Sequence, residues 1–545
     1  MTMSLRPELG GVAPLTVNLV QRVCLGDLPT RAAQQFPHRP AVVDGDAMLT
    51  YSELEARSNA AAAGLLDLGL QRGDVVAMLM PNCWEFLVTF FGCAKIGVVC
   101  MPVNLGLTAE GVAFQFDDAR PKAVVVEESF TELLAAALAA TTAVPAVQRV
   151  VVARAGSART ELAGIPVVAF AELTSATVPA VEVVVEDRDI AQCLYTSGTT
   201  SRPKAVLTSH VAVMMAALST CVQFRHERGD NHSVFPIVLP LFHVTALNTL
   251  TLPVLLTGGT VVLHRSFDPS ALLRDLAARQ VTHLMLLPIM WGQLVDAAGK
   301  GAPGSENVRM AVYAMAPMSQ QRLDDVREVF PNADVVLGSG QTEFTPPSVL
   351  QWPSHQWDKN ASWGTAVITT DVRIMGPNGE LLPRGQEGEI VYRGPQAMQG
   401  YGNNEAANTA AFTHGWFHSG DVGYLDDEGV LWFTDRIKDI VKTGGENVSS
   451  VEVERALLGH PDVADCAVVG MPDDRWGESV TAVLVPVPGR TISDDAIRYF
   501  AKEHLAGYKV PKRVIVVNDL PKTSTGKIQK HRVRAQIESR SNSQP

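Results

Sequence analysis

The sequence lacks several features that would mark a specialised class of protein. Its seven cysteines in 545 residues have no paired or metal-ligand spacing, which argues against a disulfide framework and indicates reduced thiols in a cytosolic protein. An excess of positive charge is also missing, because 57 acidic residues against 45 Lys and Arg give a formal net charge of −12. A general basic surface is therefore not expected, and we predict no nucleic-acid partner.

Long hydrophobic runs are missing as well. The most apolar span, residues 247–263, is interrupted by Pro253 and by the pair Gly258-Gly259, and it is shorter than the roughly 20 residues of a membrane-spanning helix. The amino terminus has no apolar core of a secretory signal. We expect a soluble, cytoplasmic protein without a transmembrane segment, while peripheral membrane contact and the oligomeric state stay open.

The most informative segment that is present is the loop Tyr195–Lys204. Gly198 lets its backbone turn so that successive N–H groups face one concavity, and Lys204 adds a positive charge. This is the chemistry of a polyphosphate site, although the loop lacks the Gly-Lys-Ser/Thr of the common P-loop and could by itself be a polar turn. Its hydroxyl donors are Thr196, Ser197, Thr199 and Thr200.

Further motifs follow in a fixed order. They are Ser339–Glu343, His418–Asp421, Asp435–Asp439 with Gly444–Asn447 behind it, and Pro521–Lys527. Together with the first loop, their order and spacing resemble the adenylate-forming superfamily, which includes acyl-CoA synthetases, adenylation domains of peptide synthetases and beetle luciferases. The resemblance covers residues 28–534, nearly the whole chain.

Strand-like apolar runs alternate with helical patterns through the first four fifths of the chain, which predicts an α/β fold with parallel-type sheets flanked by helices. The predicted strands include residues 75–80, 98–103, 123–126, 150–152, 260–263 and 283–287. The last hundred or so residues have strands and helices of their own and predict a small α+β lid. Capping patterns at Thr50/Glu53 and Ser449/Glu452 predict two helix starts.

The resemblance implies a domain organisation. It places an AMP- and acyl-binding domain at residues 1–435, a hinge at 436–438 centred on Lys438, and a mobile lid at 439–545. Composition alone would assign Lys438 to an exposed charged linker, because a hinge residue needs only to absorb a change of backbone torsion.

The resemblance also implies the reaction. A carboxylate attacks the α-phosphate of ATP to give an acyl-adenylate and pyrophosphate, and the thiol of CoA then displaces AMP. Lys527 corresponds to the lysine that bridges the acyl carboxylate and the phosphate, and Thr342 to the residue whose hydroxyl contacts the α-phosphate. Glu343 is the candidate ligand of Mg²⁺, which binds through one or two carboxylates and phosphate oxygens.

The remaining site residues follow from the same motifs. Asp421 is expected at the ribose hydroxyls, since an ionised carboxylate can accept from both, with Arg436 beside it unless Arg436 makes only a surface salt bridge. Gly444 and Gly445 are expected to line the CoA channel, and Trp476 is a further candidate that could equally be packing. The complete expected nucleotide-binding set is Thr196, Ser197, Gly198, Thr199, Thr200, Lys204, Ser339, Gly340, Gln341, Thr342, Asp421, Arg436 and Lys527.

The acyl pocket is expected around the segment Leu239–Val244. His243 stands where amino-acid-activating relatives have an Asp for the substrate ammonium group, which disfavours an amino-acid substrate. Apolar residues follow it, and they suggest a pocket for an uncharged chain or ring. The expected acyl-binding residues are His243, Val244, Met315, Ala316 and Gly338.

Three positions depart from the family pattern. Ser201 and Ala205 stand where the phosphate loop commonly has Gly, and Ser339 stands where an aromatic ring commonly stacks on adenine. A missing stacking partner removes about 1–3 kcal/mol if nothing replaces it. We expect a weaker affinity for ATP or an altered loop geometry.

The sequence therefore predicts an ATP- and CoA-dependent carboxylate ligase of the acyl-CoA synthetase type. The expected substrate is a medium- or long-chain fatty acid, with an aryl carboxylate as the nearest alternative. Transfer to a carrier protein in place of CoA is a second alternative, and a non-catalytic nucleotide-binding relative is a remote one.

Overall fold

Five sheets organise the part of the chain that the computed structural model describes, which comprises residues 11–142, 146–156, 159–175, 177–196, 203–299, 301–314, 318–473, 475–523 and 527–541. The chain divides into two units. Unit 1 contains Met1–Asp371 and Arg393–Ala410, and unit 2 contains Val372–Tyr392 and Ala411–Pro545. The predicted hinge at residues 436–438 falls inside unit 2 and stays a prediction.

The largest sheet of unit 1 is mainly parallel, as the sequence predicts. Its nine strands, in spatial order, are β20 (Gly400–Tyr401), β10 (Lys204–Ser209), β9 (Ile190–Thr196), β4 (Val99–Pro102), β3 (Val75–Leu79), β5 (Ala123–Glu127), β6 (Arg149–Ala153), β8 (Ile165–Ala169) and β7 (Glu161–Leu162). Antiparallel pairing joins β9 to β10, with Lys204 opposite Thr196.

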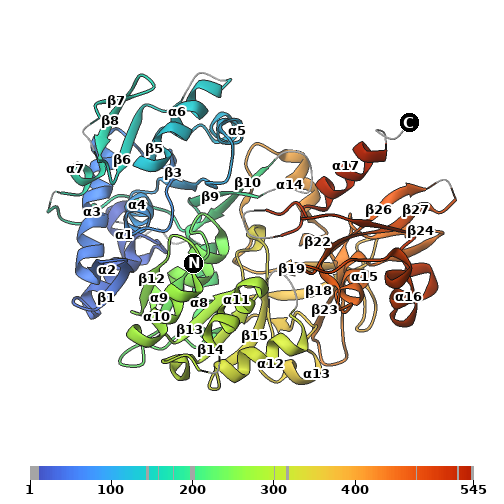
Figure 1. The fold of residues 1–545 in the computed structure, drawn as a ribbon. Helices are drawn as coiled ribbons and strands as arrows, with labels where there is room; N and C mark the ends of the chain where they lie inside the picture. Colours follow the sequence, from blue (N-terminus) through green and yellow to red (C-terminus); the bar gives the residue numbers. More distant parts are fainter. Residues whose placement is uncertain are drawn as a thin grey trace, which may run out of the picture. The chain divides into compact units, whose positions relative to one another are not determined.

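Side chains alternate between the two faces of this sheet, so that each strand serves two cores. On β3, Val76 and Met78 join one core and Ala77 and Leu79 join the other. The first core includes residues of α3 (Tyr51–Asp67) and α4 (Trp84–Lys95), and the second includes residues of α5 (Ala109–Ala119) and α6 (Thr131–Ala140). Figure 1 shows these two helix pairs on either side of the strands.

Two further sheets complete unit 1. One has the order β11 (Val234–Ile237), β12 (Thr260–Leu263), β1 (Pro40–Asp44) and β2 (Ala47–Thr50). The other has the order β13 (His283–Leu286), β14 (Met310–Tyr313), β15 (Asp334–Ser339), β16 (Val349–Leu350) and β17 (Thr365–Ala366). The other helices of unit 1 are α1 (Pro14–Gln21), α2 (Asp27–Gln35), α7 (Phe170–Thr174), α8 (His210–Gln223), α9 (Leu252–Leu256), α10 (Pro269–Arg279), α11 (Pro288–Ala298), α12 (Gln320–Val329), α13 (His355–Asp358) and α14 (Glu405–Ala411).

Unit 2 is built on two smaller sheets. The first contains β18 (Asp371–Met375), β19 (Gly388–Arg393), β22 (Trp416–Leu425) and β21 (Phe412–Thr413), with β23 (Leu431–Arg436) paired to β22. The second contains β25 (Glu446–Val448), β24 (Val441–Thr443), β27 (Gly477–Pro486) and β26 (Val463–Asp473), with β28 (Arg513–Val516) paired to β27. Its helices are α15 (Ser450–Leu457), α16 (Asp494–His504) and α17 (Lys530–Ser541).

Both predicted helix starts form. Thr50 and Glu53 make a reciprocal capping box, with Glu53 N donating to Thr50 Oγ1 at 3.2 Å and Thr50 N donating to Glu53 Oε2 at 2.8 Å. Ser449 caps α15 by accepting from Glu452 N at 3.1 Å. Caps of this kind stabilise a helix by about 1 kcal/mol.

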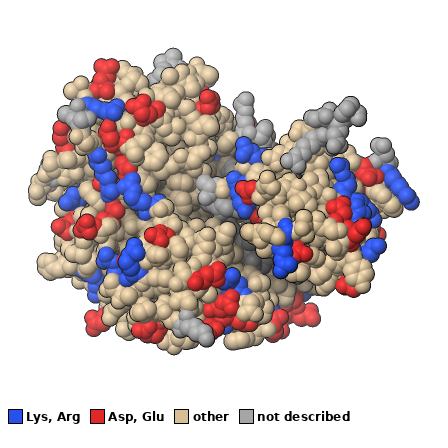
Figure 2. Space-filling model, viewed as in Figure 1, with Lys and Arg blue, Asp and Glu red and all other residues tan. Residues whose placement is uncertain are grey.

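The helices and the surface bear on the predictions about membranes and nucleic acids. Among the described residues, no helix combines the length and the apolar character that crossing a bilayer requires. On the face in Figure 2, Lys and Arg side chains are interspersed with Asp and Glu side chains. A mixed surface of this kind accords with the net charge of −12.

Candidate active site

The β9–β10 hairpin of unit 1 carries both ends of the predicted phosphate loop. Thr196 ends β9 and pairs with Lys204, the first residue of β10. The Oγ1 atom of Thr196 is buried and has no hydrogen-bond partner among the described residues, as expected of a donor that awaits a ligand. The predicted residues Ser197, Gly198, Thr199 and Thr200 lie outside the described residues, as does Ser201.

Tyr401 brings Lys204 and Glu343 together, although the sequence did not single it out. The Nζ atom of Lys204 lies 4.6 Å from the centre of the Tyr401 ring, and the Tyr401 hydroxyl donates to Glu343 Oε1 at 3.1 Å. Burial raises the pKa of Tyr401, and the negative charge of Glu343 adds to that increase. The phenol therefore stays protonated and acts as a donor to Glu343.

Two contacts hold Tyr401 in place. Its strand, β20, pairs with β10 so that Tyr401 lies opposite Val206. Asn408 clamps its backbone, accepting from Tyr401 N at 2.6 Å and donating to Tyr401 O at 2.9 Å. The departure at Ala205 is accommodated beside this strand, because Ala205 is buried in β10 and its carbonyl accepts from Gly402 N at 2.8 Å.

The segment Ser339–Glu343 leaves β15 and enters a short 3-10 turn, Thr342–Phe344. Gly340 permits a close approach, because a Cβ atom there would lie 2.6 Å from Cβ of Pro346. Ser339 ends the strand half-buried, and Gln341 precedes the turn. Thr342 and Glu343 therefore lie in a turn, which Tyr401 links to Lys204.

The carboxylate of Glu343 is the predicted ligand of Mg²⁺. Among the described residues there is no cluster of three or more His, Cys, Asp or Glu suited to a metal. Mg²⁺ in nucleotide enzymes uses one or two carboxylates, and phosphate oxygens and water complete its shell. A single carboxylate near Lys204 at the phosphate loop fits that pattern.

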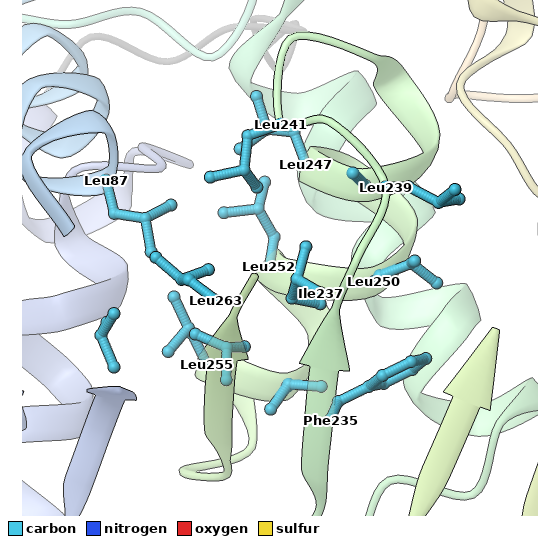
Figure 3. Close-up of a cluster of buried hydrophobic side chains, with 14 of the residues drawn as sticks. Leu87, Phe235, Ile237, Leu239, Leu241, Leu247, Leu250, Leu252, Leu255 and Leu263 are labelled. Carbon is cyan, nitrogen blue, oxygen red and sulfur yellow. The ribbon is translucent and has the colours of Figure 1, made fainter. Parts of the chain in front are cut away.

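The segment Leu239–Val244 is held by a buried carboxamide. Asn82 Nδ2 donates to the carbonyl oxygens of Ile237, Leu239 and His264 at 3.1, 2.9 and 2.9 Å, and Asn82 Oδ1 accepts from Leu241 N at 2.8 Å. Figure 3 shows leucines of this segment packed with others that follow it and with strand residues in one apolar cluster. The backbone of this predicted acyl-binding segment is therefore fixed by hydrogen bonds and by packing.

His243 and its neighbours form an apolar environment. Burial lowers the pKa of His243 to about 4, so its imidazole is neutral at pH 7. Its ring packs against Phe242 at 4.7 Å, and Val244 is buried beside it. A Cβ atom added to Gly338 would lie 3.3 Å from the Leu350 side chain. The predicted residues Met315 and Ala316 lie outside the described residues.

A π-helix, Thr245–Thr251, begins directly after this segment and continues into α9. Such wide helical turns are rare and occur frequently at functional sites. Asn248 lies in the π-helix and is fully buried, and neither its Oδ1 nor its Nδ2 atom has a hydrogen-bond partner among the described residues. The sequence did not indicate Asn248 as a site residue, because residues 245–256 form a mostly apolar run.

In unit 2, Asp421 on β22 and Arg436 on β23 are cross-strand neighbours whose closest charged atoms are 3.2 Å apart. Burial raises the pKa of Asp421, and the positive charges of Arg436 and Lys527 oppose that increase. The ion pair does not satisfy the carboxylate, since Asp421 Oδ1 has no hydrogen bond among the described residues. An oriented, unsatisfied acceptor is what a ribose hydroxyl needs.

Lys527 lies within electrostatic range of this pair. The residue keeps an exposed surface, yet its surroundings lower the pKa of its ammonium group to about 8, first by desolvation and then by the charge of Arg436, while Asp421 opposes the change. Desolvation also lowers the pKa of Lys438, the predicted hinge residue. Two chain segments thus bring several cations together around Asp421.

The predicted CoA residues also meet within unit 2. Gly444 and Gly445 have φ values of +60° and +86°, and Gly444 N donates to Trp476 O at 2.8 Å. A Cβ atom on Gly444 would lie 2.9 Å from the indole ring. Trp476 is 37% exposed, and the guanidinium of Arg475 lies 4.7 Å from the centre of its ring.

Comparison with known proteins identifies the family by two domain models. Residues 29–402 match the family model of AMP-binding enzymes, and residues 452–527 match the C-terminal domain of AMP-binding enzymes. The chain is 35% identical over 510 residues to feruloyl-CoA synthase of Amycolatopsis sp, covering 94% of this chain and 98% of that protein.

Solved structures give two further similarities. The o-succinylbenzoate coenzyme A synthetase from Bacillus subtilis, in complex with ATP and magnesium ion, has a TM-score of 0.80 at 28% identity over 94% of this chain and 99% of that chain. A fatty acyl CoA synthetase from Mycobacterium tuberculosis has a TM-score of 0.73 at 31% identity over 95% of this chain and 98% of that chain.

Proposed function

We infer that the substrate is an aromatic carboxylic acid with a polar substituent. This chain belongs to the AMP-binding enzymes. It is an AMP-forming acyl-CoA synthetase that uses ATP, CoA and a small-molecule carboxylate. A fatty acid was the first expectation from the sequence. The comparisons favour the aryl alternative, because feruloyl and o-succinylbenzoyl groups are both aromatic.

The observation that carries the proposal is the carboxamide of Asn248, which has no hydrogen-bond partner among the described residues. A buried polar group without a partner costs about 1–3 kcal/mol, and that cost disappears when a ligand supplies a hydrogen bond. A saturated fatty acyl chain offers no such bond. An aromatic acid with a hydroxyl, methoxy or second carboxyl group does, and the apolar surroundings of His243 suit its ring.

In the first half-reaction, a carboxylate oxygen of the acid forms a bond to the α-phosphorus, and the bond to the bridging oxygen breaks as pyrophosphate leaves with the electron pair. Thr196 and Lys204 hold the phosphates, and Thr342 contacts the α-phosphate. Glu343, kept in place by the Tyr401 hydroxyl, would hold Mg²⁺, whose charge offsets that of the phosphate oxygens.

Residues of unit 2 complete this step. Asp421 accepts hydrogen bonds from the ribose hydroxyls, and the positive charge of Arg436 opposes the increase that burial causes in the pKa of its carboxyl group. Lys527 is mostly protonated at pH 7, since its pKa is about 8, and its ammonium group neutralises charge between the acyl carboxylate and the phosphate.

In the second half-reaction, the CoA thiolate forms a bond to the acyl carbon, and the carbon–oxygen bond to AMP breaks. Gly444 and Gly445 leave room for the pantetheine arm beside Trp476. His243 is neutral at pH 7 and therefore contributes packing and orientation, not positive charge, at the acyl group.

A fatty acid is the second candidate substrate. It is supported by the likeness to the Mycobacterium tuberculosis fatty acyl CoA synthetase and by the apolar residues that surround the π-helix. It leaves Asn248 without a partner, which is the reason to place it second.

The test measures AMP release with Mg²⁺, ATP and CoA over a panel of ferulate, 4-hydroxycinnamate, unsubstituted cinnamate, hexanoate, palmitate and phenylalanine. We expect the substituted aromatic acids to have the highest kcat/KM. Asn248→Leu is expected to lower kcat/KM for 4-hydroxycinnamate by about tenfold or more, and to leave cinnamate nearly unchanged. A preference for palmitate in the unmodified enzyme, or equal losses for both aromatic acids in the variant, contradicts the proposal.

A further inference from the structure

A chain of buried polar contacts in unit 2 links the strand before the predicted hinge to the helix after Lys527. Asp435 on β23 is 1% exposed, and its Oδ2 atom accepts from Ser450 N at 2.5 Å and from Ser450 Oγ at 2.6 Å. Lys530 Nζ donates to the same Ser450 Oγ at 2.6 Å. The hydroxyl thus donates its only proton to Asp435 and accepts a bond from Lys530.

The chain continues beyond Lys530. The Nζ atom of Lys530 forms an ion pair with Glu454 Oε1 at 2.8 Å, and that oxygen accepts from Val468 N at 2.7 Å. Burial raises the pKa of Glu454, and the charge of Lys530 opposes that increase. One ammonium group therefore serves two carboxylates, the half-buried Glu454 directly and the buried Asp435 through a serine.

The position of these contacts gives them a role in the active site. Asp435 is adjacent to Arg436, and Lys530 opens α17 three residues after Lys527. A parallel bond, from Ser449 Oγ to Thr434 O at 2.7 Å, makes the same connection. Both bonds span residues 436–438, so any rotation of the backbone at Lys438 that separates β23 from α15 has to break them.

We propose that Ser450 and Lys530 are positioning residues for the first half-reaction, because they hold Lys527 near Asp421 and Arg436. The Asp435–Ser450–Lys530 network is closed during adenylation and opens before CoA attacks. This proposal rests on the two-step reaction described above, and it holds for any acid that the enzyme accepts.

A second lysine–glutamate pair in unit 2 serves as a control that distinguishes the positioning role of Lys530 from a general contribution to stability. Lys509 Nζ forms an ion pair with Glu452 Oε1 at 2.7 Å, and Glu452, like Glu454, lies on α15. Among the described residues, this pair makes no hydrogen bond or ion pair with Asp435 or Ser450, and the Glu452 side chain is 46% exposed. Lys509→Met therefore removes a lysine–glutamate pair from the same helix and leaves the network in place.

The experiment measures the two half-reactions separately in the full chain. ATP–pyrophosphate exchange reports adenylation, and thioester formation from a synthetic acyl-adenylate and CoA reports the second step. The acid is whichever the unmodified enzyme exchanges fastest, so the aromatic-substrate proposal can fail while this test still gives an answer. Lys527→Ala marks the level of full loss of adenylation.

We expect Lys530→Met to slow pyrophosphate exchange by on the order of ten- to a hundredfold, since a displaced catalytic group loses its orientation. Thioester formation should change by less than about threefold, and Lys530→Arg should restore most of the exchange. Ser450→Ala should show the same bias with a smaller loss, and it covers the case in which Lys530→Met fails to fold. Lys509→Met should leave both rates near those of the unmodified enzyme.

Equal losses in the two half-reactions for Lys530→Met and Ser450→Ala would show a structural role only and would overturn the proposal. The same conclusion follows if neither variant changes the exchange rate, or if Lys509→Met shows the same bias as Lys530→Met.

Discussion

At the scale of single residues, Tyr401 contacts two charged side chains of the predicted site. Its ring lies under the Lys204 ammonium group and its hydroxyl donates to Glu343. A cation over an aromatic face and a hydrogen bond to a carboxylate each fix one partner's position. The phenol thereby sets the distance between the lysine of the phosphate loop and the proposed Mg²⁺ ligand.

We predict that Tyr401→Phe raises the KM for Mg²⁺–ATP by on the order of tenfold, because the ring over Lys204 remains but the donor to Glu343 is lost. Tyr401→Leu, which removes the ring as well, should be worse. Pyrophosphate exchange at varied Mg²⁺–ATP measures both. Tyr499 is a matched control, since it is exposed and its hydroxyl also pairs with a glutamate, Glu503. Unchanged exchange in Tyr401→Phe, or an equal effect of Tyr499→Phe, contradicts the prediction.

The partners of a residue explain which site residues the sequence could predict. Lys204, Glu343 and Lys527 lie in motifs whose composition and order are visible along the chain. Tyr401 lies between two glycines, and nothing nearby indicates that its hydroxyl meets Glu343, far back in the sequence. The same applies to Ser450, because its partners come from β23 and α17.

At the scale of elements, the predicted strands formed close to their predicted bounds. Residues 75–80 became Val75–Leu79, and residues 283–287 became His283–Leu286. Their pairing is parallel, as the alternation with helices predicted. The π-helix at Thr245–Thr251 was not predictable, because an apolar run has no signal that separates a wide turn from an ordinary one.

The turn at Gly444 carries an element-scale prediction. Gly444→Ala places a methyl group 2.9 Å from the Trp476 ring, so either the turn or the indole has to move. We expect the KM for CoA to rise several-fold, with pyrophosphate exchange nearly unchanged, because the change affects the second half-reaction alone.

Gly445→Ala is the control for backbone strain. Gly445 also has a positive φ, but a Cβ atom there meets nothing within 4 Å. A larger rise in the KM for CoA in Gly444→Ala than in Gly445→Ala supports the contact with Trp476. Equal effects would point to strain alone and would remove Trp476 from the argument.

At the scale of the whole molecule, each unit contains a part of the predicted site that is assembled from its own residues. Unit 1 holds Lys204, Tyr401 and Glu343 together, and unit 2 holds Asp421 with Arg436. The predicted α/β class with a smaller second domain is confirmed by the structure and by the family match. The order of the motifs along the chain predicted a large domain and a smaller second one. It did not predict which strands belong to which unit.

Buried histidines predict how stability depends on pH. Burial lowers the pKa of His283 and of His210 to about 4, and Arg309 and Arg225 add to the effect at His283. His226 packs against His283 with ring centres 4.6 Å apart, and burial lowers its pKa well below the ordinary value. Each stays neutral in the folded protein at a pH where the unfolded chain protonates it.

The sign follows from linkage. The folded pKa lies below the unfolded value of about 6.5, so the stabilising contribution is complete above pH 6.5 and is lost as the pH falls toward 4. We predict that the melting temperature falls steadily from pH 7 to pH 4.5. His283→Gln should flatten this dependence, while His38→Gln, at an exposed position of the same unit, should leave it unchanged. A slope that is the same in all three proteins contradicts the prediction.

The bonds of Asn82 have a consequence for how the enzyme can be redesigned. One carboxamide ties three carbonyls and one amide of separate segments together beneath Leu239–Val244. The backbone of this segment is therefore held in one shape before any acid binds, which lowers the ordering cost of binding. Single side-chain substitutions along the π-helix should therefore change which acid the enzyme prefers, while the backbone of this segment keeps its conformation.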